Sequence, residues 1–247
     1  MDTTAPAEPD GTASSLGRSG ESARNRVTRA LREKLIIGRI QPGRGMTLRG
    51  LAAELGVSPM PVREAIQGLA AERALDLSPS GRICVPRLDQ RRIGEILDAR
   101  ALLEPRAAEL AAPHIDRDCA RQLARIDDDI DRSLLDGDVE RYLRLNHDFH
   151  FTIYRRSQSD VFLPLIETLW LRFGPFMRMI YGRVGTTGLV DHHKRAIAAA
   201  ERGQARELSE AIRLDIHEGM QLIAEALKDQ DAAGAGGPLP VRRRRAV

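Results

Sequence analysis

Four side chains in the second half of the chain have the chemistry of metal ligands. Asn146 and His150 lie four residues apart and share one face of a predicted helix, while His193 and His217 follow on two later helices. Three imidazoles and one amide oxygen can hold a borderline divalent cation such as Zn²⁺, Ni²⁺ or Mn²⁺ in a helical bundle. The spacing alone does not show that the four residues converge. Surface histidines, or core histidines with satisfied hydrogen bonds, would give the same pattern.

Arg100 is a candidate for binding an anion. A guanidinium that faces a cavity clamps a carboxylate through two parallel hydrogen bonds. The alternative is that Arg100 forms an ordinary surface ion pair with Glu104, which lies four residues later on the same predicted helix.

A different kind of chemistry is expected in the first third of the chain, where a helix-turn-helix is predicted. A helix over about 22–37 is followed by a short helix over Leu48–Leu55, with Thr47 as its N-cap. Gly56 then occupies a position that favours a left-handed backbone, and Ser58 caps a third helix that has Pro59 at its first position and runs to about Arg73. A β-hairpin with Gly81 at its tip comes next and would form a wing.

The third helix is the expected reader of DNA, because the second helix of this motif enters the major groove with its N-terminal side chains against bases and phosphates. Arg63 can contact a guanine edge or a phosphate, and the sequence does not decide between them. On the wing, Arg82 is expected beside the minor groove. The candidate contacts from the helix itself are Ser58, Met60, Pro61, Arg63 and Gln67.

Everything after Arg87 has helical periodicity, with helices expected near 89–112, 117–135, 138–157, 160–181, 188–202 and 204–228. A break at Gly174-Pro175 would raise the number from six to seven. The predicted fold is therefore mainly α: an N-terminal winged helix-turn-helix with a small β-hairpin wing, and a C-terminal all-α bundle of six or seven helices.

Charge divides the chain in the same way. Residues 21–88 hold 12 Lys and Arg against 6 Asp and Glu, whereas residues 89–230 hold 21 against 25. A basic segment suits a polyanion such as DNA, and the acidic one does not. We predict a disordered tail over 1–20, a DNA-binding domain over 21–88, a helical ligand-sensing and dimerisation domain over 89–230, and a disordered basic tail over 231–247.

Several classes of protein are disfavoured. No apolar run is long enough for a membrane span, and the N-terminus lacks the pattern of a signal peptide, so a cytoplasmic protein is expected. Cys84 and Cys119 are interpreted as free thiols. The sequence has no Gly-rich phosphate loop, no nucleophile elbow and no HExxH motif, which argues against an enzyme.

The stretch LRGLAAELGVSPMPVREAIQGLAAERAL resembles the signature of the GntR family of transcription regulators. Farther along, DARALLEPRAAELAA, LNHDFHFTIYRRS and DHHKRAIAAAERGQ resemble the helical FCD ligand-sensing domain of the FadR-like subfamily. The resemblance covers about residues 22–228. It implies a homodimer that binds a short palindromic operator in double-stranded DNA and responds to an effector, most simply as a repressor.

Residue by residue, the resemblance assigns DNA contacts and a metal site. The DNA contacts are Arg49, Ser58, Met60, Pro61, Arg63 and the wing tip at Gly81. The chain departs from the family by Pro59, where Arg is common, and by Arg73, where Gly is common. The implied metal ligands are Asn146, His150, His193 and His217, with His192 and Asp148 as competing choices. Arg100 falls near the effector pocket of the family, which implies a small carboxylate as the effector.

Two other functions compete with a ligand-responsive regulator. A bound metal could serve hydrolysis in an enzyme, or the chain could be a constitutive DNA-architectural protein. The second would need no sensing pocket, and its affinity for DNA would not depend on metabolites.

Overall fold

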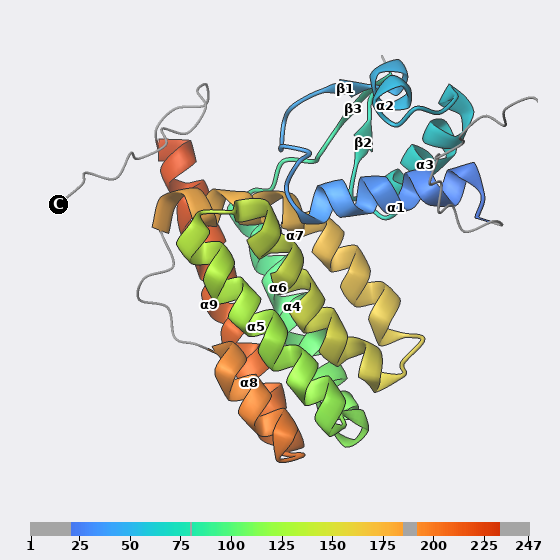
Figure 1. Ribbon diagram of the computed structural model, residues 1–247. Coiled ribbons are helices and arrows are strands. Elements are labelled where there is room, and N and C mark those ends of the chain that lie inside the picture. The colour runs from blue at the N-terminus through green and yellow to red at the C-terminus, as the bar shows by residue number, and fades with distance from the viewer. Residues whose placement is uncertain (1–20, 80, 185–191, 233–247) are drawn as a thin grey trace, which may run out of the picture.

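The computed structural model describes residues 21–79, 81–184 and 192–232. The N-terminal domain contains α1 (Ala23–Ile36), β1 (Met46–Thr47), α2 (Leu48–Glu54), α3 (Pro59–Ala71), β2 (Asp76–Leu77) and β3 (Arg82–Cys84). The C-terminal domain contains α4 (Gln90–Ala111), α5 (Arg117–Asp136), α6 (Val139–Tyr154), α7 (Phe162–Val184), α8 (His192–Glu201) and α9 (Ala205–Ala232). The predicted winged helix-turn-helix followed by a helical bundle is thus confirmed (Figure 1).

Local signals set the helix-turn-helix. The α1 helix buries a stripe of side chains four residues apart, Val27, Leu31 and Leu35. The Thr47 hydroxyl accepts a hydrogen bond from the Gly50 N–H at 3.1 Å and so starts α2. Gly56 then adopts φ +64°, a left-handed conformation that costs glycine little, and the chain turns into α3.

The wing contains one strand more than the sequence predicts. Strand β3 lies between β1 and β2 and pairs with both in the antiparallel sense, with Ile83 opposite Met46 on one side and Leu77 on the other. Strand β1 has only two residues, which are too few to show the alternation that identifies a strand in a sequence. The fully buried Ile83 side chain fastens this small sheet to the core of the domain.

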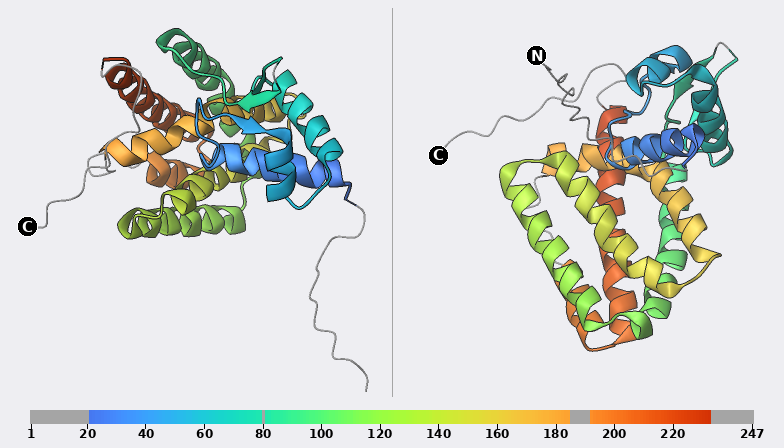
Figure 2. Two further views of the ribbon diagram at one scale, coloured as in Figure 1. Left: turned by 90° about the horizontal axis from the view of Figure 1, so that it is seen from above. Right: turned by 45° about the vertical axis from the view of Figure 1, so that its right-hand side comes forward.

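The bundle keeps the six predicted helices. Helix α9 packs along α4 and α8, and α5 lies beside α6 (Figure 2). Helix α7 remains one helix with Pro175 inside it, so the seventh helix does not occur. Three predicted segments lie wholly or partly outside the described residues. They are the tail over 1–20, the first residues of the predicted 188–202 helix, and almost all of the tail over 231–247. No helix in the described ranges is long and apolar enough to cross a bilayer.

The N-terminal domain sits on one end of the bundle, with α1 lying across α6 and α7 (Figure 1). Gly174 of α7 packs tightly against α1, because a Cβ atom at this position would come 3.1 Å from the Cα of Ile36. Ion pairs surround this contact. Arg39 reaches Glu140 of α6 at 2.7 Å, and Arg32 reaches Glu167 of α7 at 3.0 Å.

Candidate functional site

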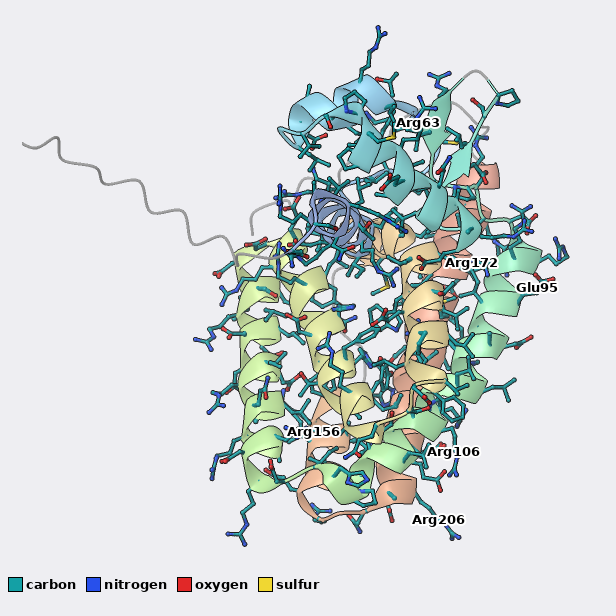
Figure 3. The ribbon with its side chains drawn as sticks, turned by 90° about the vertical axis from the view of Figure 1, so that its right-hand side faces the viewer. Arg63, Glu95, Arg106, Arg156, Arg172 and Arg206 are labelled. Carbon is teal, nitrogen blue, oxygen red and sulfur yellow. The ribbon has the colours of Figure 1, made fainter. Side chains whose placement is uncertain are left out.

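The predicted DNA contacts form the outer surface of the N-terminal domain. Pro61 is half-buried, and the other predicted contacts are exposed: Arg49, Ser58, Met60, Arg63, Gln67, Gly81 and Arg82. Figure 3 places Arg63 in this upper domain, away from the helical bundle. An exposed helix that carries Arg63 beside a wing is an arrangement that can enter a DNA groove.

Two details of this surface differ from the expectation. Ser58 occupies the N-cap of α3 with an extended backbone, but its side chain makes no capping hydrogen bond. The backbone and Pro59 at the first helical position therefore start α3. On the wing, the Arg82 side chain lies against Gly45, where the absence of a Cβ atom leaves room for it.

The second candidate site is a cluster formed by α6, α8 and α9, called here the buried cluster: His150 is buried and His193 nearly so, while the Asp215 side chain is 28% exposed. His150 of α6, His193 of α8 and Asp215 of α9 each offer a ligand atom, and these atoms lie within 4.8 Å of one another. His150 Nε2 is 3.2 Å from one oxygen of Asp215, and His193 Nε2 is 3.7 Å from the other oxygen. Both imidazoles therefore present Nε2 to the same carboxylate.

Neighbouring side chains determine which nitrogen of each ring carries the proton. The Tyr154 hydroxyl donates to Glu104 at 2.7 Å and therefore accepts from His150 Nδ1–H at 3.0 Å. His193 Nδ1 faces a carboxylate oxygen of Asp127 at 3.2 Å and donates to it. With both protons on Nδ1, each Nε2 has a lone pair directed toward Asp215, which is also an acceptor. A cation between these three groups would satisfy all of them.

The ionisation of the cluster suits such a role. Burial lowers the pKa of His150, and the neighbouring Asp215 only partly offsets this effect. Burial acts to raise the pKa of Asp215, but the close approach of His150, with His193 and Arg100 nearby, lowers it well below its usual range. Neutral imidazoles and an ionised carboxylate are the forms that bind metals.

Arg100 lies at the other end of the same buried network. Its Nε atom donates to Glu104 at 2.6 Å and its Nη2 at 3.1 Å, and both side chains are almost completely buried. The guanidinium also stacks on Phe173 at 3.8 Å, while Trp170 Nε1 donates to Glu104 at 3.2 Å. Arg100 thus pairs with Glu104, as in the alternative interpretation of this residue. The pair, however, lies in the core and not on the surface.

The structure brings together only part of the predicted ligand set. His150 and His193 converge, and Asn146 is buried on the same face of α6 one turn before His150. His217 is exposed, with its Nε2 2.8 Å from the Gln221 amide, because it lies about 200° around α9 from Asp215.

The competing choices also lie outside the cluster. His192 Nε2 is 3.3 Å from a carboxylate oxygen of Glu218, and Asp148 pairs with His147 at 3.3 Å.

Asp215 is the residue that sequence reasoning missed. It lies three residues after Ile212 and four after Ala211, both buried, so it belongs to the apolar stripe of α9. A carboxylate within an apolar stripe must be paired or bind a cation. The sequence therefore contained a signal for Asp215, although the predicted ligand on this helix was His217.

Comparison with known proteins identifies the two domains. Residues 23–85 match the family described as "Bacterial regulatory proteins, gntR family", and residues 95–218 match the FCD domain. The regulator McbR of Escherichia coli is 31% identical over 166 residues, which are 67% of this chain and 75% of McbR. The gluconate operon transcriptional repressor of Bacillus subtilis is 30% identical over 152 residues, which are 62% of this chain and 60% of the repressor.

Solved structures agree with these matches. The structure of E. coli McbR/YncC has a TM-score of 0.76 at 28% identity, covering 85% of this chain and 99% of that one. A putative GntR regulator from Rhodococcus sp. RHA1 has a TM-score of 0.66 at 20% identity, which is a likeness of fold. Since these relatives are regulators, the prediction that the chain is not an enzyme is confirmed. The chain belongs to the GntR family of transcription regulators, in the subfamily whose helical domain is an FCD domain.

Proposed function

We propose that this regulator is a repressor that binds a palindromic operator as a homodimer and responds to a small carboxylate bound beside a divalent metal. The name of one relative, the gluconate operon repressor, supports the repressor role. One recognition helix covers only a half-site, which supports a dimer. The observation that carries the proposal is the buried polar network that runs from Arg100 to His193 and adjoins the helix contacting α1.

In this proposal α3 supplies the reading surface, and Arg63 is its central side chain. Arg63 is exposed on α3, and Arg49 is exposed at the start of α2. A guanidinium on α3 can form two hydrogen bonds to a guanine or bind a phosphate. Met60, which is 62% exposed, offers an apolar contact to a thymine methyl group.

The metal would be held by His150, His193 and Asp215, and Asn146 is the candidate for a further oxygen ligand. The donors fit a divalent cation, because the ligands of a tetrahedral or octahedral ion with bonds near 2.1 Å lie about 3.0–3.4 Å apart. The observed separations of 3.2 and 3.7 Å are close to this range. Two imidazoles with oxygen ligands suit Zn²⁺, Ni²⁺ or Mn²⁺.

A carboxylate is the effector class that the charges favour. A bound cation and the permanently charged Arg100 would both attract an anion in a site with little water. Arg100 is close enough to Asp215 to help lower the pKa of that carboxyl. Arg100 already forms two hydrogen bonds to Glu104, so an effector would share or replace this partner.

Helix α7 provides the route by which the site would influence DNA binding. Trp170 and Phe173 of α7 contact the Glu104–Arg100 pair, and the next residue, Gly174, packs directly on Ile36 of α1. A displacement of the Arg100–Glu104 pair would therefore shift the contact between α7 and α1, which lies within about one helical turn of it. Two packed arrangements of α7 against α1 would be the switch.

The test is to select duplexes from a random library with the full chain and measure the affinity of the selected sequence with and without chelator. We expect selected sites with two-fold symmetry and an affinity that changes when metal is removed or when small carboxylates are added. The matched variants are Arg63→Ala and Arg156→Ala. Only the first should weaken binding to the selected sequence, because Arg156 lies in the bundle (Figure 3). Symmetric sites whose affinity ignores both chelator and carboxylates would favour an architectural protein and refute the sensing role.

A further inference from the structure

A cavity lies between the two domains, separate from the buried cluster. It has a volume of about 560 Å³ and is lined by α1, α6 and α7. Ligand pockets of small molecules have volumes of about 300–1,000 Å³ and are common at domain interfaces. Helix α1 forms one wall, so any occupant would contact the DNA-binding domain directly.

Aromatic rings form the inner wall of this cavity. Phe151 and Trp170 line it but are almost fully buried, so His147, which is partly exposed, presents the accessible ring of this wall. His147 stacks on Phe151 with the ring centroids 4.2 Å apart and meets Trp170 edge-on at 5.4 Å. Such a wall suits a flat apolar group, which can stack or make edge contacts with the rings.

The rim of the cavity keeps an excess of positive charge after its own ion pairs are formed. Among the lining residues, Arg32 pairs with Glu167 and Arg144 with Glu33, and Asp148 lies 3.3 Å from His147 Nδ1, so that four arginines face three carboxylates in all.

Two lining cations remain beyond these pairs. Arg29 pairs with Glu21, which is not part of the wall. Arg155 forms no carboxylate pair among the described residues, and its guanidinium lies 5.5 Å from the Phe151 ring centroid. A cation beside an aromatic wall therefore faces the cavity.

We infer that this cavity binds a small aromatic carboxylate, with its ring against His147 and its charge on Arg155. The site is distinct from the buried cluster because Trp170 lies between them. The Nε1 atom of Trp170 donates to Glu104 in the bundle, while other atoms of the same residue line the cavity. An aromatic anion bound here would brace α1 against α6 and α7.

The test uses the intrinsic fluorescence of Trp170, which is the only tryptophan of the chain. The full chain is titrated with benzoate and phenylacetate, with acetate as the control without a ring and benzylamine as the cationic control. We expect a saturable change with the two aromatic acids only. Isothermal titration with the same compounds checks that the optical change reports binding.

Variants assign the response to the cavity. Arg155→Gln should weaken the binding of benzoate about tenfold, the effect of losing one hydrogen bond to a charged group. The matched control, Arg156→Gln, alters the adjacent arginine, which does not line the cavity, and should leave the affinity unchanged. Asp215→Asn alters the buried cluster and should also leave benzoate binding intact, which separates this inference from the proposed sensing site.

Two results would overturn the inference. One is the absence of saturable binding of either aromatic acid. The other is binding that Asp215→Asn abolishes and Arg155→Gln does not change, because the acid would then occupy the bundle site.

Discussion

The contact between Gly174 and α1 predicts a specific stability effect. In Gly174→Ala, the new Cβ atom would lie 3.1 Å from Ile36 Cα and 3.3 Å from the Leu35 carbonyl oxygen. Both neighbours are backbone atoms of a helix, so they cannot move aside as a flexible side chain could. Overpacking of this kind typically costs about 1–3 kcal/mol.

The matched control is Gly219→Ala. Gly219 is also inside a helix, α9, but a Cβ atom there would meet nothing within 4 Å. Replacing an unobstructed helical glycine by alanine stabilises a protein by about 0.8–1.0 kcal/mol. The difference between the two variants contains the contact with α1 and a further steric cost of a Cβ atom before Pro175, and it should be about 1–3 kcal/mol.

The assay is thermal unfolding of the two variants side by side. A domain of this size loses about 2–4 °C of Tm for each kcal/mol. We therefore expect Gly174→Ala to melt several degrees below Gly219→Ala, and its operator affinity to change because α1 is displaced. Equal melting temperatures for the two variants would refute the close packing of α7 on α1 and remove the proposed route between the sites.

Three further outcomes are expected. Arg63→Ala should weaken operator binding by about 1–3 kcal/mol in a gel-shift titration, and an unchanged affinity would remove Arg63 from the reading surface. Tyr154→Phe should lower the free energy of unfolding by about 1–3 kcal/mol in a denaturant titration, because Glu104 and His150 each lose a buried partner; a neutral effect would contradict the network. Hydrogen bonding by Arg39 lowers the pKa of Glu140 from its usual 4.5, so the stability that Glu140→Gln removes is present above about pH 4.5 and lost below it. Melting curves of wild type and Glu140→Gln across pH test this sign, and a stability difference that grows on acidification would contradict it.

The sequence was sufficient for the architecture because its signals are local. The capped turn at Gly56 and the stripe of Val27, Leu31 and Leu35 are read within a few residues, and the structure has both. The two-residue strand β1 could not be read in the same way, since its partner β3 lies far along the chain.

The candidate site was only partly accessible from the sequence. The family resemblance placed His150 and His193 in one ligand set, and the two lie together in the structure. Which residue of α9 faces them depends on the rotation of that helix in the bundle. A two-residue difference reverses the face, so Asp215 points inward and His217 outward. The burial of the Arg100–Glu104 pair likewise depends on Trp170 and Phe173, which come from a helix distant in sequence.

The metal content of three purified proteins tests the central claim most directly. Wild type, Asp215→Asn and His217→Ala are each dialysed against a divalent metal and then against buffer, and the retained metal is measured by elemental analysis. The cluster of His150, His193 and Asp215 predicts stoichiometric metal in wild type and in His217→Ala, and a large loss in Asp215→Asn. Full retention in Asp215→Asn together with loss in His217→Ala would contradict the site described here.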